Sequence, residues 1–332
     1  MVNFLQAFWQ ATRPRTYPLA VAGIIVANAL AYSRIGSFNS KNWQIFLLSL
    51  WVALGLQILS NLANDYGDGI RGTDAHRLDR QTAQGTINPK TLKKLIISWA
   101  LFIFGCGIGL LWLSFNSLTD FFTFLALGII AIMAAVTYTM GKNPYGYNAK
   151  GEIAVFLFFG LVNVLGGVYL QTQFIRVMDI IAAVVIGLLC TCVLMINNMR
   201  DFDTDTGAGK NTLATTLGKE SMSHLYRFML LGAYFLLITF VTLRQNFYLL
   251  SLLVLVSPIA KHLKMVRHYS DENIPSNALA PELAKIVLIT LATSVLMSLS
   301  ILIFNYKKLI WKKSKNFSHW YWQAKRKAYN TH

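Results

Sequence analysis

The sequence predicts an all-α membrane protein built from nine transmembrane helices. Of its 332 residues, 55% are hydrophobic and only 13% are charged, whereas a soluble domain carries about 25% charged residues. The apolar residues form runs close to the length of about 20 that a helix needs to cross a bilayer. They do not alternate with polar residues, as the strands of a membrane barrel would. We therefore expect an integral membrane protein with no separate soluble domain.

The expected spans follow one another with short polar connections. They are 17–33, 43–63, 92–114, 120–140, 153–171, 179–199, 224–243, 247–266 and 284–305. We expect the first run to be retained, not cleaved as a signal peptide, because the segment before it is long and carries Arg13 and Arg15. The weakest span is 247–266, which Pro258 interrupts. We divide the chain into an intramembrane domain, 1–305, and a basic aromatic tail, 306–332, expected to lie along an interface.

The charge distribution predicts the orientation of the chain. A net charge of +16 would suggest nucleic acid in a soluble protein. Here we expect basic loops against the lipid bilayer and no nucleic-acid partner. With the N-terminus inside, the cytoplasmic segments before residue 305 hold 18 of the 30 Lys and Arg residues, and the opposite loops hold four. Those four are Arg34, Lys41, Arg176 and Arg244. The pattern indicates a multi-pass protein of the cell (inner) membrane. The eight basic residues of the tail conflict with it, because nine spans would place them outside.

Six of the 14 acidic residues lie in two short stretches, each of which closes an apolar run. They are Asp65, Asp68, Asp74, Asp201, Asp203 and Asp205. On a helix, Asn61, Asp65 and Asp68 share one face, with Asn64 beside them. Asp201 and Asp205 are likewise spaced i, i+4, and Asn197 and Asn198 precede them by one turn. In the predicted orientation both stretches face the cytoplasm.

Carboxylates packed this closely repel one another unless a cation lies between them. Oxygen-rich sites of Asp and Asn suit Mg²⁺, which often binds through one or two carboxylates plus substrate phosphates. Two such clusters facing each other would hold a diphosphate through Mg²⁺. The expected metal ligands are Asn64, Asp65, Asp68, Asp201 and Asp205. The alternative is that these residues only cap helices or keep loops soluble. Two stretches of similar composition, each at the end of an apolar run, make this alternative the weaker explanation.

Basic residues follow both acidic stretches. Arg71, Arg77 and Arg80 come after the first stretch, and Arg200 and Lys210 lie within the second. Arginine presents a planar fork to phosphate oxygens and lysine a point charge. These residues are therefore candidates for binding a diphosphate, although each could simply mark the cytoplasmic side. Arg200 and Lys210 are the better candidates because they lie within a few residues of carboxylates.

Three segments together resemble the UbiA-type intramembrane prenyltransferases, in particular the group that uses 1,4-dihydroxy-2-naphthoate in menaquinone synthesis. They are residues 11–16 (ATRPRT), residues 60–69 (SNLANDYGDG) and residues 197–214, which contain NNMRDFDTD and AGKNTLA. The resemblance implies a nine-helix bundle around a central cavity that opens toward lipid. It also implies Mg²⁺-dependent transfer of a polyprenyl chain from a polyprenyl diphosphate to an aromatic acid. With dihydroxynaphthoate as the acceptor, loss of diphosphate and CO₂ would give a demethylmenaquinone.

The resemblance also implies roles for individual residues. Asn61, Asn64, Asp65 and Asp68 would form the first metal and diphosphate site, and Asp201 and Asp205, with Asn198 one turn earlier, the second. Further candidates come from chemistry. Asp203, on another face of its helix, is a candidate base for the phenolic proton of the acceptor. Arg13 and Arg15 could reach the carboxylate of the acceptor, or could be plain positive-inside anchors.

Some alternatives remain open at the level of sequence. Another aromatic acceptor, such as 4-hydroxybenzoate or a chlorin, would need the same diphosphate site. A secondary transporter with the Asp clusters as ion sites is a rival of a different class. The first motif also departs from the family pattern: Gly72 stands four residues after Asp68, and Asp74 comes two residues later. Whether Asp74 belongs to the metal site is therefore undecided.

Overall fold

The protein is helical throughout the part that the structure describes. The computed structural model describes residues 4–72, 81–271 and 274–329, with side chains described for 4–72, 81–246, 250–270 and 274–307. Within these residues the only pairing of strand type is a bridge between Asn148 and Asn211. The predicted all-α class is confirmed.

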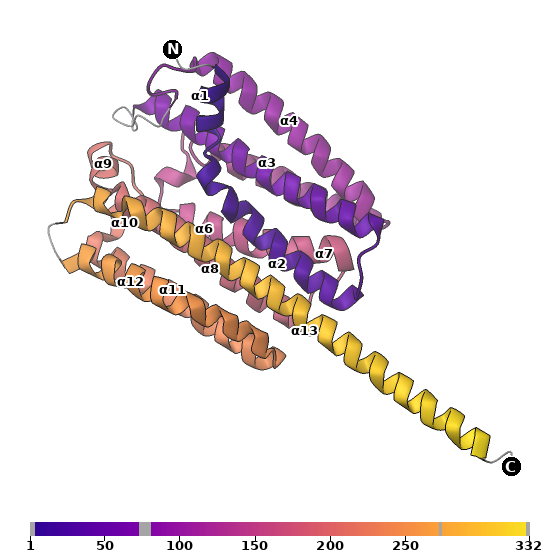
Figure 1. The fold of residues 1–332 in the computed structure, drawn as a ribbon. Coiled ribbons are helices and arrows are strands. Elements are labelled where there is room, and N and C mark those ends of the chain that lie inside the picture. The colour runs from indigo at the N-terminus through magenta and orange to yellow at the C-terminus, as the bar shows by residue number, and fades with distance from the viewer. Residues whose placement is uncertain (1–3, 73–80, 272–273, 330–332) are drawn as a thin grey trace.

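The long helices form a bundle whose connections are short helical elements (Figure 1). The long helices are α2 (Tyr17–Ile35), α3 (Ser40–Arg71), α4 (Pro89–Ser114), α5 (Leu118–Thr137), α8 (Val177–Arg200), α11 (Lys219–Arg244), α12 (Val256–Asp271) and α13 (Ala280–Tyr329). The shorter α-helices are α1 (Phe4–Ala11), α6 (Gly151–Val155), α7 (Gly166–Thr172), α9 (Phe202–Gly207) and α10 (Leu213–Leu217). The remaining elements are 3₁₀-helices η1 (Pro14–Thr16), η2 (Tyr145–Tyr147), η4 (Phe247–Leu255) and η5 (Ser276–Leu279), and the π-helix η3 (Phe156–Leu165).

Eight helical segments of the described chain are long and apolar enough to cross a membrane. They correspond to the predicted spans except 247–266, so a count of nine is not confirmed. That segment forms η4 followed by α12. The 16 residues of α12 span only about 24 Å, and Lys261 and Lys264 lie within it. The short α-helix and its two lysines leave this segment outside the eight candidates, which rest on length and composition alone.

The outer surface of the bundle is apolar, as a lipid environment requires. None of the residues of α5 is buried, although its sequence is almost entirely hydrophobic. Trp112 is 80% exposed and Phe228 is 75% exposed. A soluble protein rarely exposes continuous apolar surface of this kind, whereas hydrocarbon is its natural solvent. The multi-pass membrane architecture is therefore confirmed.

Helix α8 lies at the centre of the main core. Its buried residues pack with those of α2, α11 and α13 in one hydrophobic cluster. The π-helix η3 crosses α8 very closely, because Gly160 faces Gly187 with no side chain between them. In Figure 1, α3 and α4 lie on one side of the bundle and α11 and α12 on the other, with α2 and α13 side by side between them. This division leaves the ends of α3 and α8 facing each other across the middle.

Helix α13 continues through the predicted boundary between the membrane domain and the tail. It runs unbroken for 50 residues from Ala280 to Tyr329. The boundary at 305 therefore does not coincide with the end of a helix, and the division into 1–305 and 306–332 stays a prediction.

Candidate active site

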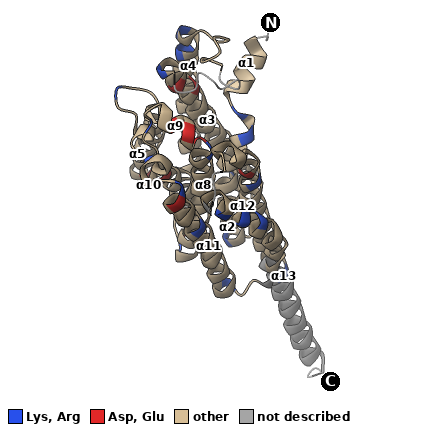
Figure 2. Cartoon of the chain, turned by 90° about the vertical axis from the view of Figure 1, so that its left-hand side faces the viewer, with Lys and Arg blue, Asp and Glu red and all other residues tan. Residues whose placement is uncertain are grey.

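The two acidic stretches lie at the same end of the bundle, and Lys210 joins them. Its Nζ atom lies 3.9 Å from Oδ1 of Asp68 and 3.8 Å from Oδ1 of Asp205. Asp68 comes from the end of α3, and Asp205 comes from α9, directly after α8. Figure 2 shows acidic residues on and around α9, at the end of the molecule where α1 also lies. The fold thus brings together charges from opposite halves of the chain.

Asp68 is held from the loop that follows α5. The hydroxyl of Tyr147 donates a hydrogen bond of 2.7 Å to Oδ1 of Asp68. Lys210 Nζ lies 4.9 Å from the centre of the Tyr147 ring. The loop is itself fixed, because the amide of Ala149 donates to the carbonyl of Asn211. Tyr147 therefore orients a carboxylate and a cation at once. Sequence reasoning missed it, because a single tyrosine in a short loop carries no pattern.

Asp65 has a different environment, although it lies only one turn from Asp68. Its Oδ1 accepts a hydrogen bond from the amide of Gln81, and its Oδ2 accepts from the amide and hydroxyl of Thr82, each at 3.1 Å. The residue is 1% exposed and is not among those that line the cavity described below. In this structure its carboxylate ties the loop after α3 back onto the helix.

The end of α8 carries the second set of polar side chains. The guanidinium of Arg200 donates to both oxygens of Asp201, at 2.8 and 2.7 Å, and to Oδ1 of Asn197 at 2.9 Å. Asn198 donates to the buried carboxylate of Glu152 at 2.8 Å. Sequence reasoning missed Glu152, although an acidic residue at the edge of an apolar run is itself a signal of function.

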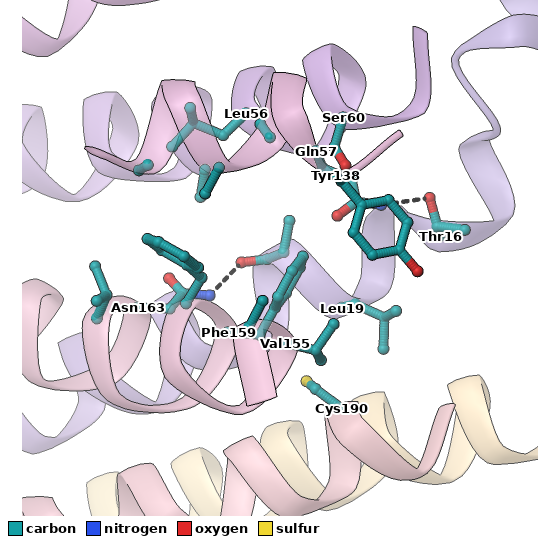
Figure 3. A pocket seen from close by; sticks show the side chains of 18 of the residues that line it. Thr16, Leu19, Leu56, Gln57, Ser60, Tyr138, Val155, Phe159, Asn163 and Cys190 are labelled. Carbon is teal, nitrogen blue, oxygen red and sulfur yellow. Dashed lines mark hydrogen bonds between the residues drawn. The ribbon is translucent and has the colours of Figure 1, made fainter. Parts of the chain in front are cut away.

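The segment before the first span is fixed by amides of α3. The Thr16 hydroxyl accepts hydrogen bonds from Gln57 and Asn61, each at 2.9 Å, and Asn61 also donates to the carbonyl of Thr12. Figure 3 shows the bond between Gln57 and Thr16. Arg13 adopts the left-handed backbone region, with φ of 49°, which costs energy for a residue other than glycine. The bonds around it hold both arginines of this segment in place.

Asn64 carries an unsatisfied oxygen. Its Oδ1 atom is buried and has no hydrogen-bond partner among the described residues, while its side chain lines the cavity. A buried carbonyl oxygen without a partner is costly. Such an oxygen is suited to receive a ligand or a cation.

The structure does not bring every predicted residue to the same place. The Arg71 guanidinium donates to the carbonyls of Thr139 and Gly141 and does not line the cavity. Asp203 also lies outside the lining: its carboxylate accepts from the hydroxyl of Ser276 at 2.6 Å and pairs with Lys219 at 3.2 Å. The hydrogen bond from Ser276 holds the pKa of Asp203 below its usual value. Arg77, Arg80 and Asp74 lie outside the described residues.

A cavity of about 1110 Å³ opens beside these groups. Polar residues gather at one end of it: Arg13, Arg15, Asn61, Asn64, Asp68, Asn197, Asn198, Arg200, Asp201, Asp205 and Lys210. The rest is mostly apolar, and Figure 3 shows Leu19, Leu56, Val155 and Phe159 around it. On α5 the lining extends from Asp120 to Ala135, which is about 22 Å along the helix. The shape suits a long apolar molecule with a charged head.

Tyr138 stands where the polar and apolar parts of the cavity meet. Burial raises the pKa of its hydroxyl well above the usual value, and the carboxylates of Glu152, Asp68 and Asp205 add to this effect. The hydroxyl therefore stays protonated at physiological pH and can donate a hydrogen bond, but it cannot act as a base.

Comparison with known proteins identifies the family. Residues 20–280 match the UbiA prenyltransferase family. The chain belongs to this family. It is 40% identical over 304 residues to a 1,4-dihydroxy-2-naphthoate octaprenyltransferase of Haemophilus influenzae, which covers 90% of this chain and 96% of that protein. It is 38% identical over 303 residues to the protein of the same name from Escherichia coli, with coverage of 90% and 96%. The resemblance stated from the sequence motifs is confirmed.

The fold agrees with that of solved members of the UbiA family. A UbiA homolog from Archaeoglobus fulgidus, bound to GPP and Mg²⁺, has a TM-score of 0.57 against this chain at 13% identity. The likeness covers 89% of this chain and 99% of the archaeal chain. At such low identity the comparison shows that the bundle is the UbiA fold.

Proposed function

We propose that this UbiA-family protein transfers a polyprenyl group from a polyprenyl diphosphate to 1,4-dihydroxy-2-naphthoate in menaquinone biosynthesis. Diphosphate and CO₂ leave, and the product is the reduced form of demethylmenaquinone. The observation that carries the proposal is the joining of Asp68 and Asp205 by Lys210 at the polar end of a large apolar cavity. The names of relatives that share 38–40% identity with the chain support the choice of acceptor.

The polar end of the cavity fits Mg²⁺. Among the described residues, no three His, Cys, Asp or Glu side chains form a ready-made metal cluster. Mg²⁺, however, commonly binds through one or two carboxylates plus substrate phosphates and keeps several waters. Asp68 and Asp205 supply carboxylates there, and the unsatisfied Oδ1 of Asn64 supplies a neutral oxygen. We propose these three residues, with Asp201, as the metal-holding set. When bound, the ion would offset the charge of the leaving diphosphate.

The side chains of the chain itself would position the donor. Lys210 and Arg200 place positive charge at the polar end, where a diphosphate would carry its negative charge. The apolar walls would hold the prenyl chain and exclude water from the allylic carbon as its bond to oxygen breaks. Dry surroundings leave the aromatic ring as the nucleophile, so carbon–carbon bond formation competes successfully with hydrolysis.

The acceptor is expected to lie between the N-terminal segment and Tyr138. Arg13 and Arg15 line the cavity and would hold the carboxylate of the naphthoate. Tyr138, protonated at neutral pH, would donate a hydrogen bond to a ring oxygen. We propose supporting roles for Asp65, Asp203 and Arg71, because their polar groups are engaged in loop contacts and they do not line the cavity.

We also propose the orientation that the charge pattern predicts. The catalytic end would face the cytoplasm, and the protein would lie in the cell (inner) membrane. This placement would give the polar end of the cavity access to water-soluble dihydroxynaphthoate, while the prenyl chain would enter from the lipid.

Product analysis tests the proposal directly. Purified protein in detergent would receive farnesyl diphosphate with dihydroxynaphthoate or, separately, with 4-hydroxybenzoate, with and without Mg²⁺. We expect a prenylated naphthoquinol, detected by mass after oxidation, and stoichiometric CO₂ only in the first case. A preference for 4-hydroxybenzoate would assign the protein to a different quinone, and activity that survives EDTA would contradict the metal site.

A further inference from the structure

Three arginines lie together at the end of the bundle opposite the candidate active site. The charge pattern predicts few basic residues on that side. Of the four basic residues in the loops of that side, Arg34, Arg176 and Arg244 gather around the single acid Asp179. Arg34 lies in the last turn of α2, Arg176 precedes α8, and Arg244 ends α11. Each is therefore at the end of a candidate span, at the depth where lipid headgroups begin.

The cluster carries more positive charge than its carboxylate can compensate. Oδ1 of Asp179 pairs with the Arg34 guanidinium, and Oδ2 accepts from the backbone amide of Arg176 at 2.7 Å. Asp179 is fully buried, and the Arg34 side chain is 7% exposed. Both oxygens of Asp179 are thus engaged, and no ion pair among the described residues joins Arg176 or Arg244 to a carboxylate.

The two remaining arginines are held in place by weaker contacts. The guanidinium of Arg176 lies 5.2 Å from the centre of the Phe174 ring, and that of Arg34 lies 5.1 Å from the same ring. Arg244 donates to the hydroxyl of Ser33 at 3.3 Å, but its Nη1 atom is buried with no hydrogen-bond partner. A buried guanidinium nitrogen without an acceptor is costly, and the oxygen of an anionic ligand would satisfy it.

We propose that this cluster binds a phosphate group, and that its source is the headgroup of an anionic phospholipid in the leaflet opposite the active site. Three guanidinium groups against one carboxylate leave a net charge of +2, which suits a phosphodiester anion. Basic pockets between transmembrane helices bind the headgroups of anionic lipids on the cytoplasmic side, and the same charge attraction would act in the opposite leaflet. The bound lipid would tie together α2, α8 and α11, three helices that build the core.

Lipid-dependent stabilisation of the purified protein tests the proposal. The thermal midpoint in detergent would be measured during titration with phosphatidylglycerol, phosphatidylcholine or inorganic phosphate. We compare the wild type with Arg176→Gln, with Arg176→Gln/Arg244→Gln, and with Lys41→Gln. Lys41 is the matched control, because it is an exposed basic residue of the same side that lies outside the cluster.

We expect phosphatidylglycerol to raise the midpoint of the wild type and of Lys41→Gln, and phosphatidylcholine to have little effect. The apparent affinity for phosphatidylglycerol should fall about fivefold for each arginine removed. Inorganic phosphate at millimolar concentration is the arm that tests the source of the phosphate group. If it protects the wild type but not the double variant, the cluster is a phosphate site whose ligand is the free ion and not a lipid. If the double variant fails to fold, the single variant Arg176→Gln decides the test. Arg176 is exposed, so its replacement should not disturb the packing of the bundle. An unchanged response in that variant, or an equal loss in Lys41→Gln, overturns the proposal.

Discussion

At the scale of single residues, acidic side chains that are close in the sequence have different hydrogen-bond partners near the polar end of the cavity. Asp68 and Asp65 lie on the same helix, yet Asp68 meets Tyr147 and Lys210, while Asp65 accepts bonds from the loop at Gln81 and Thr82. Of these two carboxylates, only that of Asp68 therefore places its charge at the cavity.

Lys210→Ala should impair use of the prenyl diphosphate. The substitution removes the cation that lies between Asp68 and Asp205, so the substrate would meet two uncompensated carboxylates. We expect kcat/KM for the prenyl diphosphate to fall about a hundredfold, with a smaller change in the KM for the aromatic acid. Steady-state kinetics with each substrate varied in turn would measure both effects.

Lys219→Ala is the matched control for this prediction. Lys219 lies on the same side but pairs with Asp203 away from the cavity. Its removal should change kcat/KM less than about threefold. Equal losses in the two variants, or a loss confined to the aromatic acid, would contradict the role assigned to Lys210.

Asp68→Asn and Asp203→Asn should differ by orders of magnitude. Asp68 lines the cavity and is in our metal-holding set, whereas Asp203 contacts Ser276 and Lys219. We expect Asp68→Asn to cost roughly 3 kcal/mol of transition-state stabilisation, about a hundredfold in rate, and to raise the Mg²⁺ concentration needed. Asp203→Asn should keep most of the activity. A Mg²⁺ titration of both variants measures the difference, and an inactive but folded Asp203→Asn would restore Asp203 as a candidate base.

At the scale of secondary-structure elements, the backbones of the π-helix η3 and of α8 approach each other closely where Gly160 faces Gly187. An added Cβ at Gly160 would lie 2.5 Å from Cα of Gly187 and 2.8 Å from the carbonyl oxygen of Ala183. Both are backbone atoms, which cannot move without shifting a helix. Close approach of this kind replaces the hydrophobic effect as the source of helix association in lipid.

Gly160→Ala should therefore destabilise the bundle. We expect a loss of about 1–3 kcal/mol from overpacking, seen as a lower thermal midpoint in detergent. Gly105→Ala is the control, because nothing lies within 4 Å of a Cβ added at Gly105. That substitution should leave the midpoint unchanged or raise it, since alanine favours helix more than glycine does. A similar drop in both variants would show that η3 and α8 do not depend on this contact.

At the scale of the whole molecule, the bundle separates two charged ends. One end holds Asp68, Asp205 and Lys210 beside the cavity, and the other holds the arginine cluster around Asp179. The helices between these ends expose apolar surface to lipid. The orientation of the molecule therefore decides from which side of the membrane water-soluble molecules reach the polar end of the cavity.

Cysteine labelling in intact cells should report this orientation. In a background without Cys106, Cys190 and Cys192, a cysteine at Thr86 or Glu220 should resist an impermeant thiol reagent, because charge counting places both positions in the cytoplasm. A cysteine at Lys41, exposed at the other end, should react. The reverse pattern of labelling would invert the proposed orientation.

The sequence by itself determined the fold class of the protein and indicated which residues would form its candidate site. Apolar runs of about 20 residues without alternation indicate membrane helices, because a helix pairs all its backbone polar groups within one segment. Asn and Asp at helical spacing also placed Asp68, Asp201 and Asp205 near a shared polar site, because spacing along one helix is a local property. Pro258 already marked 247–266 as the weakest span, and this segment is the one that is not among the eight candidates.

Only the tertiary structure decided which polar group meets which partner. Asp65 and Asp68 have equivalent places in the sequence pattern, but about 60° of rotation around the helix directs one to Thr82 and the other to Tyr147 and Lys210. The gathering of Arg34, Arg176 and Arg244 around Asp179 depends in the same way on three helices that are distant in sequence. Periodicity specifies the face of a helix, whereas the neighbour of that face is set by the packing of the whole bundle.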